Sequence, residues 1–187
     1  MENIIIDTVR VLKKGGTILY PTDTIWGIGC DATSNKAVDK VFRIKGRKLQ
    51  KSFIVLLDSA EKLEQYSDGV SPVAYDLIEQ YTRPLTIIYP RAKKLAKHVI
   101  ASDGTIAIRI VKNDFCRELI RAFGKPIVST SANFSGTPNP SIFRDIDPLI
   151  KESVDYVVPL YQDEIHKVNP STIIQLLDNG SFKIIRD

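Results

Sequence analysis

Residues 15–31 read GGTILYPTDTIWGIGCD, and residues 53–57 read FIVLL. The stretch from Thr17 to Tyr20 and the run at 53–57 are short and apolar, as is typical of buried strands. Between them, Ser34 is a good N-cap for a helical pattern that continues to Lys45. A strand, a helix and a second strand in this order indicate an α/β fold.

The rest of the chain continues this alternation. Helical patterns cover residues 3–14, 60–66, 72–81, 114–123 and, weakly, 141–150. Strand patterns cover residues 85–89, 105–110, 126–129, 154–159, 172–177 and 182–185, and the last two form a predicted hairpin across residues 178–180. We therefore predict an α/β (α+β) fold, with one domain over residues 1–187 and a mixed sheet flanked by helices.

Composition narrows the class of protein. A length of 187 residues suits one domain, and 43% hydrophobic and 26% charged residues are ordinary for a soluble globular protein. No apolar run reaches the roughly 18 residues of a membrane span, and the residues around Glu2 lack a signal-peptide pattern. Cys30 and Cys116 are far apart, which favours reduced thiols in a cytoplasmic protein. The cysteines and two histidines show no zinc-site spacing, so no metal ligands are predicted.

The charge balance favours an anionic ligand. The net charge is +4 and the pI is about 9.0. A mildly basic protein of this kind fits either a nucleotide or a nucleic acid, and the charge does not choose between them.

Four cations stand between the second helix and the following strand: Lys45, Arg47, Lys48 and Lys51. Several Lys and Arg side chains converge where a ligand carries several phosphates, because each neutralises part of the charge. A solvated basic turn would show the same pattern, so this cluster alone does not establish a site.

Two segments rich in hydroxyl groups follow predicted strands. They read PTDT at residues 21–24 and STSANFSG at residues 129–136. Hydroxyls and backbone N–H groups in such segments can bind phosphate oxygens, although a structural turn or a polar loop would look similar. Neither segment matches a Walker A loop, a dinucleotide fingerprint or a nucleophile elbow.

Arg109 lies on an alternating strand between Ile108 and Ile110, so it points to the opposite face. A half-buried arginine needs an anionic partner, either a ligand or a structural carboxylate. Ser171 and Arg186 stand near other strand ends. Cations and hydroxyls without an obvious nucleophile favour nucleotidyl or phosphoryl transfer, which depends on positioning and charge stabilisation.

Taken together, the motifs resemble those of the YrdC family of threonylcarbamoyl-AMP synthases, in its short single-domain form. The resemblance covers nearly the whole chain, and the ordered set is far more specific than any one motif. The matching segments are YPTDTIWGIG at 20–29, KGR at 45–47, PLT at 84–86, IAIRI at 106–110, STSANFSG at 129–136, STII at 171–174 and the terminal Arg186.

This resemblance implies a fold and a reaction. The family fold is a twisted mixed α/β sheet with a basic concave cleft. The implied enzyme is a nucleotidyltransferase that converts L-threonine, bicarbonate and ATP, with Mg²⁺, into threonylcarbamoyl-AMP and pyrophosphate. A downstream complex then transfers the threonylcarbamoyl group to position 37 of tRNA.

Site residues follow from the same resemblance, position by position. Thr24, Arg109 and Ser171 match threonine-binding positions, and Lys45 and Arg47 match catalytic cations. The matches to ATP-binding positions are Lys45, Arg47, Lys51, Thr105, Ser131, Asn133, Asn139 and Arg186.

The chain also departs from the family pattern. Lys48 replaces a proline after KGR, and Leu56 stands where long-form members have a threonine-binding histidine. Two other functions therefore remain open. One is a module that binds double-stranded RNA or tRNA without ATP chemistry, and the other is an adenylating relative with a different acceptor.

Overall fold

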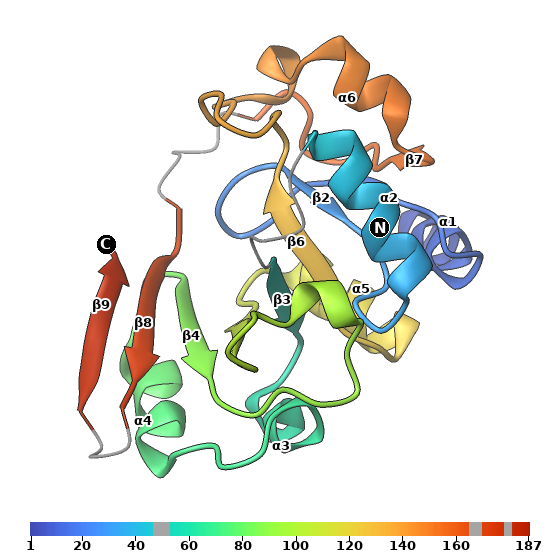
Figure 1. Cartoon of the computed structure of the whole chain (residues 1–187). Helices are drawn as coiled ribbons and strands as arrows, with labels where there is room; N and C mark the ends of the chain where they lie inside the picture. Colours follow the sequence, from blue (N-terminus) through green and yellow to red (C-terminus); the bar gives the residue numbers. More distant parts are fainter. Residues whose placement is uncertain (47–52, 165–169, 178–180) are drawn as a thin grey trace.

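Within the described residues, nine strands form one mixed sheet (Figure 1). The computed structural model describes residues 1–46, 53–164, 170–177 and 181–187. Across the sheet the strand order is β7-β1-β2-β6-β3-β5-β4-β8-β9. The strands are β1 Ile18–Tyr20, β2 Gly27–Gly29, β3 Ile54–Leu57, β4 Leu85–Tyr89, β5 Ile106–Ile110, β6 Ile127–Ser131, β7 Tyr156–Val157, β8 Thr172–Leu176 and β9 Phe182–Arg186.

The sheet is mixed, as predicted. The β1–β7, β3–β5 and β4–β8 pairs are parallel, and the other neighbouring pairs are antiparallel. The predicted terminal hairpin is confirmed, because β8 pairs with β9 and places the C-terminal strand at the edge of the sheet (Figure 1). The turn that joins these strands, residues 178–180, lies outside the described residues.

Helices surround this sheet. They are α1 Glu2–Lys13, α2 Asn35–Lys45, α3 Leu63–Tyr66, α4 Pro72–Gln80, α5 Asp114–Phe123 and α6 Pro148–Ser153. Short 3₁₀ helices cover Ala60–Lys62, Lys97–Val99 and Phe143–Asp145. Among the described residues, none of these helices combines the length and apolar character that crossing a bilayer requires.

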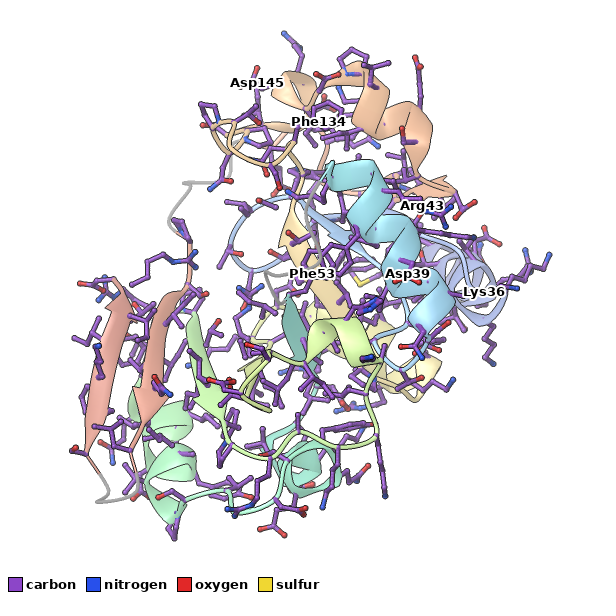
Figure 2. All side chains as sticks on the ribbon, in the orientation of Figure 1. Lys36, Asp39, Arg43, Phe53, Phe134 and Asp145 are labelled. Carbon is purple, nitrogen blue, oxygen red and sulfur yellow. The ribbon has the colours of Figure 1, made fainter. Side chains whose placement is uncertain are left out.

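Local sequence explains where the two best-defined helices begin and end. The Ser34 hydroxyl accepts the backbone N–H of Ala37 at 3.3 Å to start α2, and Gly46 ends it with φ +57°. Gly124 likewise ends α5 in the left-handed region at φ +76°. Lys36 and Arg43 lie on the exposed side of α2, whereas Phe53, the first residue of the second described range, is buried (Figure 2).

Two hydrophobic cores occupy opposite faces of the sheet, because successive strand residues alternate in direction. Ile18 and Tyr20 join the side chains of α1 and α5 in one core, while Leu19 between them joins α2 in the other. Leu56 of β3 belongs to the α1–α5 core and is paired in register with Arg109 of β5. Arg109 therefore shares the face of the sheet on which the α1–α5 core lies.

Five predictions of local structure were wrong. β2 was not predicted, and Thr130 and Ser131 belong to β6 rather than to the loop that follows the predicted strand at 126–129. The predicted helix at 60–66 is a 3₁₀ turn followed by one short helix, and the helix at 141–150 is replaced by a 3₁₀ turn and the later α6. The strand at 154–159 shortens to β7 because only two residues pair with β1.

Glycine is required within β2. A Cβ on Gly29 would lie 2.6 Å from a ring carbon of Tyr20 and 2.7 Å from the carbonyl oxygen of Val128. Since real Cβ atoms do not approach other atoms this closely, β2 fits between β1 and β6 only without a side chain there. This close packing fixes where the following and preceding loops emerge.

Candidate functional site

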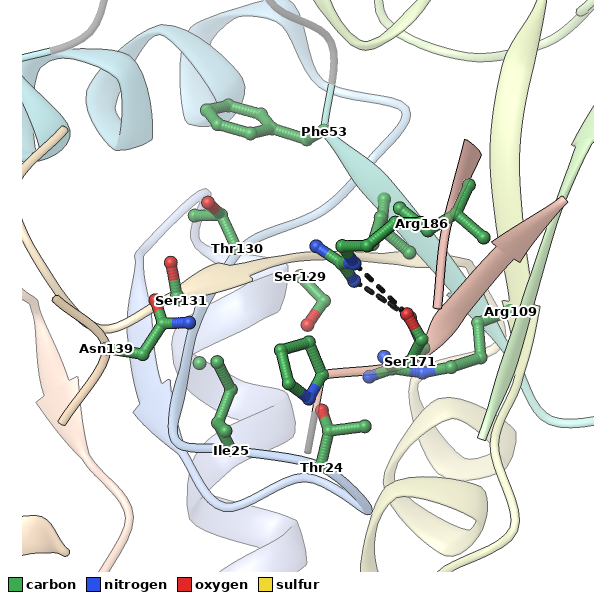
Figure 3. Close-up of a pocket in the computed structure, with 14 residues that line it drawn as sticks. Thr24, Ile25, Phe53, Arg109, Ser129, Thr130, Ser131, Asn139, Ser171 and Arg186 are labelled. Carbon is green, nitrogen blue, oxygen red and sulfur yellow. Dashed lines mark hydrogen bonds between the residues drawn. The ribbon is translucent and has the colours of Figure 1, made fainter. Parts of the chain in front are cut away.

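A polar cavity of about 260 Å³ opens where several strand ends and loops meet (Figure 3). Its walls come from the loop between β1 and β2, the starts of β2, β3 and β8, the C-terminal parts of β5, β6 and β9, and the loop after β6. The lining residues are Thr24, Ile25, Gly27, Phe53, Ile54, Arg109, Ser129, Thr130, Ser131, Asn139, Pro170, Ser171, Ile173 and Arg186.

A buried ion pair stands at one side of this cavity. Arg109 Nη2 lies 3.2 Å from Asp23 Oδ1, and the two side chains are only 3% and 7% exposed. The contact lacks hydrogen-bond alignment, so Arg109 Nε and Nη2 have no hydrogen-bond partner among the described residues. Buried guanidinium groups are costly to leave unsatisfied, so Arg109 is a candidate receptor for an anion.

Arg186 enters the cavity from the end of β9. Its Nη2 donates to the carbonyl oxygen of Ser171 at 2.8 Å, and its Nε donates to the same oxygen at 3.2 Å (Figure 3). Burial, followed by the positive charge of Arg109, lowers the pKa of Arg186 from its usual value. Two guanidinium groups that repel each other across one cavity favour a bound anion.

The hydroxyl group of Thr86 fixes the position of the Ser171 side chain. The hydroxyl groups of Thr86 and Ser171 lie 2.7 Å apart, and both residues are buried. Arg186 Nη2 also approaches the Ser171 hydroxyl at 3.3 Å. The side chain of Ser171 therefore has a defined position between Thr86 of β4 and Arg186 of β9.

Thr24 is fixed by the turn that follows β1. The Thr22 hydroxyl donates to the carbonyl oxygen of Ile25 at 2.7 Å and accepts the backbone N–H of Thr24 at 3.1 Å. The two threonine hydroxyls are 2.9 Å apart. This local network, typical of hydroxyl-containing turns, presents Thr24 and Ile25 to the cavity.

Lys45 supports the wall formed by the end of β6. It is the last residue of α2, is only 3% exposed, and its Nζ donates to Ser131 O at 2.6 Å and Asn133 Oδ1 at 2.8 Å. Asn133 in turn donates from Nδ2 to the carbonyl oxygen of Thr137 at 2.5 Å. The prediction that Lys45 lies in a loop of cations was therefore wrong, because burial and these acceptors hold it beneath the wall.

The structure brings together many of the predicted site residues. Those lining the cavity are Thr24, Arg109, Ser131, Asn139, Ser171 and Arg186. Asn133 and Asn139 also line an adjoining hollow of about 350 Å³, so Asn139 stands between the two spaces.

Five predicted site residues are not placed among the residues that line the cavity: Lys45, Asn133, Thr105, Arg47 and Lys51. Thr105 is absent from the described lining, and its hydroxyl donates to Asp103 Oδ1 at 2.7 Å. Arg47 and Lys51 lie outside the described residues, as does Lys48. The predicted nucleotide contacts of these residues stay predictions.

Sequence reasoning missed several residues of the site. Asp23 was expected only to offer a carboxylate within the PTDT segment, with no link to Arg109, and Thr86 of the PLT segment had no predicted role of its own. For Asp23 the available signal was an acidic side chain beside two threonines after a buried strand. The cavity also has aliphatic walls from Ile25, Ile54 and Ile173, and none of these has a polar signature in the sequence.

Comparison with known proteins agrees with this architecture. The Sua5/YciO/YrdC family model, described as "Telomere recombination", matches residues 10–187. A threonylcarbamoyl-AMP synthase of Pseudoalteromonas translucida (strain TAC 125) is 31% identical over 187 residues, which cover 97% of this chain and 98% of the relative.

Solved structures share the fold. E. coli YciO superposes with a TM-score of 0.86 at 26% identity, covering 100% of this chain and 90% of that one. P. abyssi Sua5 complexed with L-threonine gives a TM-score of 0.86 at 24% identity, which shows the fold alone, and the match covers 97% of this chain and 53% of that chain. The match of the family model over nearly the whole chain, together with these relatives, shows that the chain belongs to the Sua5/YciO/YrdC family.

Proposed function

We propose that this chain, as one domain over residues 1–187, is a threonylcarbamoyl-AMP synthase acting as a nucleotidyltransferase. The observation that carries the proposal is the convergence of Arg109, Arg186 and the hydroxyls of Thr24, Ser131 and Ser171 on one cavity. Relatives that align along almost the whole chain bear this name. The substrates would be L-threonine, bicarbonate and ATP.

The amino acid would occupy the side of the cavity formed by Arg109, Thr24 and Ser171. Arg109 has buried donors left over from its contact with Asp23, and a carboxylate can accept two of them in parallel. The hydroxyl groups of Thr24 and Ser171 can donate or accept hydrogen bonds with the rest of the amino acid. A ligand without hydrogen-bond acceptors would leave the arginine donors unsatisfied.

ATP would occupy the side of the cavity nearer the end of β6. Ser131 and Asn139 line the cavity there and Asn133 lines the adjoining hollow, while Arg186, bonded to Ser171, would reach the nucleotide from the amino-acid side. The contacts of Lys51 and Thr105 with the nucleotide, and the catalytic roles of Lys45 and Arg47, are part of the proposal. Lys45 would act by fixing Ser131 and Asn133, since its Nζ is bonded to both residues.

The chemistry needs alignment more than a nucleophilic side chain. The amine nitrogen of threonine forms a bond to the carbon of bicarbonate, and loss of water gives a carbamate. A carbamate oxygen then attacks the α-phosphorus of ATP, and the bond to the leaving pyrophosphate breaks. Fixed positive charge offsets the charge that develops on the phosphoryl oxygens, and alignment of the two reactants supplies much of the rate.

Mg²⁺ would enter with the triphosphate as part of the substrate. Among the described residues, no group of three or more His, Cys, Asp or Glu side chains could hold a metal ion. The described residues therefore do not provide a metal site of this kind, and the ion would be held by the phosphates of ATP. Transfer of the product to tRNA by a downstream complex, and action in the cytoplasm, belong to the same proposal.

Release of pyrophosphate tests this function. We expect ATP-dependent release only when L-threonine and bicarbonate are both present, and mass spectrometry should detect the adenylate built from labelled threonine and bicarbonate. Release that is indifferent to both additions would contradict the proposal. Preference for serine or another acceptor would instead indicate a relative with different specificity, and RNA binding without turnover would indicate a binding module.

A further inference from the structure

The Asp23–Arg109 pair joins two separate parts of the cavity wall. Asp23 belongs to the turn after β1, and Arg109 belongs to β5. Asp23 Oδ2 also accepts the backbone N–H of Lys112 at 3.4 Å, so the carboxylate is attached to the segment that follows β5. Its position is thus set by its own turn and by the strand that carries its partner.

The pair is incomplete as a structural ion pair. A buried arginine with a purely structural role normally satisfies its donors with well-aligned acceptors. Here Arg109 Nε and Nη2 and Asp23 Oδ1 all lack an aligned hydrogen-bond partner among the described residues, although the ions are 3.2 Å apart. Arg109 lines the cavity, so its guanidinium group is within reach of a ligand there.

Other groups near Arg109 do not replace this carboxylate. Burial, and then the neighbouring Cys116, raises the pKa of Tyr20, and burial also raises the pKa of Cys116. Both groups are therefore neutral at physiological pH. Arg186 carries a like charge and repels Arg109, and burial, followed by this repulsion, lowers the pKa of Arg186. Within the described residues, Asp23 is the one carboxylate that forms an ion pair with Arg109.

We propose that Asp23 is a positioning residue, whose carboxylate orients the guanidinium of Arg109 toward the carboxylate of the amino-acid substrate. The inference rests on the proposed function, because it assigns the anion at Arg109 to the amino acid. Without Asp23, repulsion from Arg186 would turn the guanidinium, and the unaligned donors would no longer meet the substrate. Asp23 itself would not touch the reacting atoms.

A double-mutant cycle tests this arrangement, because it isolates an effect that acts through a second residue. The variants are Asp23→Asn, Arg109→Gln and the double variant, each compared with the wild-type enzyme. The measurements are the KM for threonine, the KM for ATP and the melting temperature. Asp58→Asn is the matched control, since Asp58 is also a buried carboxylate, is paired with Lys62 at 2.8 Å and is absent from the described cavity lining.

We expect Asp23→Asn to raise the KM for threonine by about 10- to 100-fold, as the loss of an orienting partner does elsewhere. The KM for ATP should stay within about twofold, because this interaction concerns the amino acid. Adding Asp23→Asn to Arg109→Gln should change the threonine KM no further. Asp58→Asn should lower the melting temperature without changing either KM, since lost stability alone reduces the amount of active enzyme.

The outcomes separate this inference from the proposed function. Wild-type enzyme that releases no pyrophosphate with threonine and bicarbonate overturns both. Active wild-type enzyme with an unchanged threonine KM in Asp23→Asn, or with effects that multiply in the double variant, overturns only the inference. If Asp23→Asn does not fold, the double variant removes both charges, and its comparison with Arg109→Gln alone decides the matter: equal threonine KM values support the inference and a further rise contradicts it.

Discussion

Replacing Lys45 by methionine should destabilise the protein as well as impair catalysis. The lysine is buried, and its Nζ bonds to Ser131 O at 2.6 Å and to Asn133 Oδ1 at 2.8 Å. A hydrogen bond to a charged group contributes about 1.5–3 kcal/mol, so the two together contribute roughly 3–6 kcal/mol. Burial of the ammonium opposes part of this, which leaves an expected loss of about 2–4 kcal/mol.

This loss is large enough to measure by thermal unfolding. For a domain of this length each kcal/mol lowers the melting temperature by roughly 2–4 °C, so Lys45→Met should lower it by roughly 4–16 °C. Lys36→Met is the control, because Lys36 is exposed on the same helix and should change stability by no more than about 0.5 kcal/mol (Figure 2). Circular dichroism of both variants and the wild type makes the comparison.

Equal melting temperatures for Lys45→Met and Lys36→Met would refute the reasoning. That result would mean that the two acceptors find other donors or that the ammonium contributes no net stability. Lys45 would then have to act on the substrate directly rather than by holding the end of β6. Kinetics of Lys45→Met under conditions where the variant is fully folded would measure that remaining contribution.

Three further predictions concern packing, thiol reactivity and pH. Gly29→Ala should cost roughly 1–3 kcal/mol or more in unfolding free energy, because its Cβ would overlap the neighbouring strands, and a chemical melt equal to that of wild type would contradict this. Cys30 and Cys116 are buried, and burial raises the pKa of both thiols, so Ellman's reagent should label them only after denaturation. Rapid labelling of the native protein would show that at least one of the two thiols is accessible. Hydrogen bonds from Thr105 lower the pKa of Asp103 in the folded protein. They therefore stabilise the fold at pH values above the pKa of Asp103 in the unfolded chain, about 3.9. This stabilisation is lost as the pH falls through the lower pKa that Asp103 has in the folded protein. Thr105→Val should raise the pKa of Asp103 in an NMR titration. An unchanged pKa would show that the Thr105 hydroxyl does not stabilise the carboxylate of Asp103.

Much of the fold could be predicted because local signals agree with the tertiary structure. Ser34 and Gly124 mark helix ends through capping and left-handed geometry, and the structure confirms both predictions. β2 could not be predicted in this way, because glycine weakens strand propensity. Gly29 is in a strand because β1 and β6 flank β2 and leave no space for a side chain, which is a property of the assembled sheet.

The site could be predicted only in part, for a similar reason. The alternation around Arg109 predicts that it faces away from Ile108 and Ile110 and needs an anion. The sequence does not show that Asp23 supplies part of that anion, since the two residues meet only through folding. In the same way, Thr130 and Ser131 at the end of β6 were predicted as part of a loop because they are polar, and their polarity reflects the cavity that they line rather than the absence of a strand.

The cavity wall draws on positions from Thr24 to Arg186, so these positions can meet only after β9 has been synthesised. β8 pairs in parallel with β4, and β9 pairs with the other edge of β8, so these two strands complete the wall. Contacts between such distant positions close slowly during folding. A nascent chain stalled before Ser171 would therefore contain most of the sheet but would lack the part of the cavity wall that Ser171 and Arg186 form.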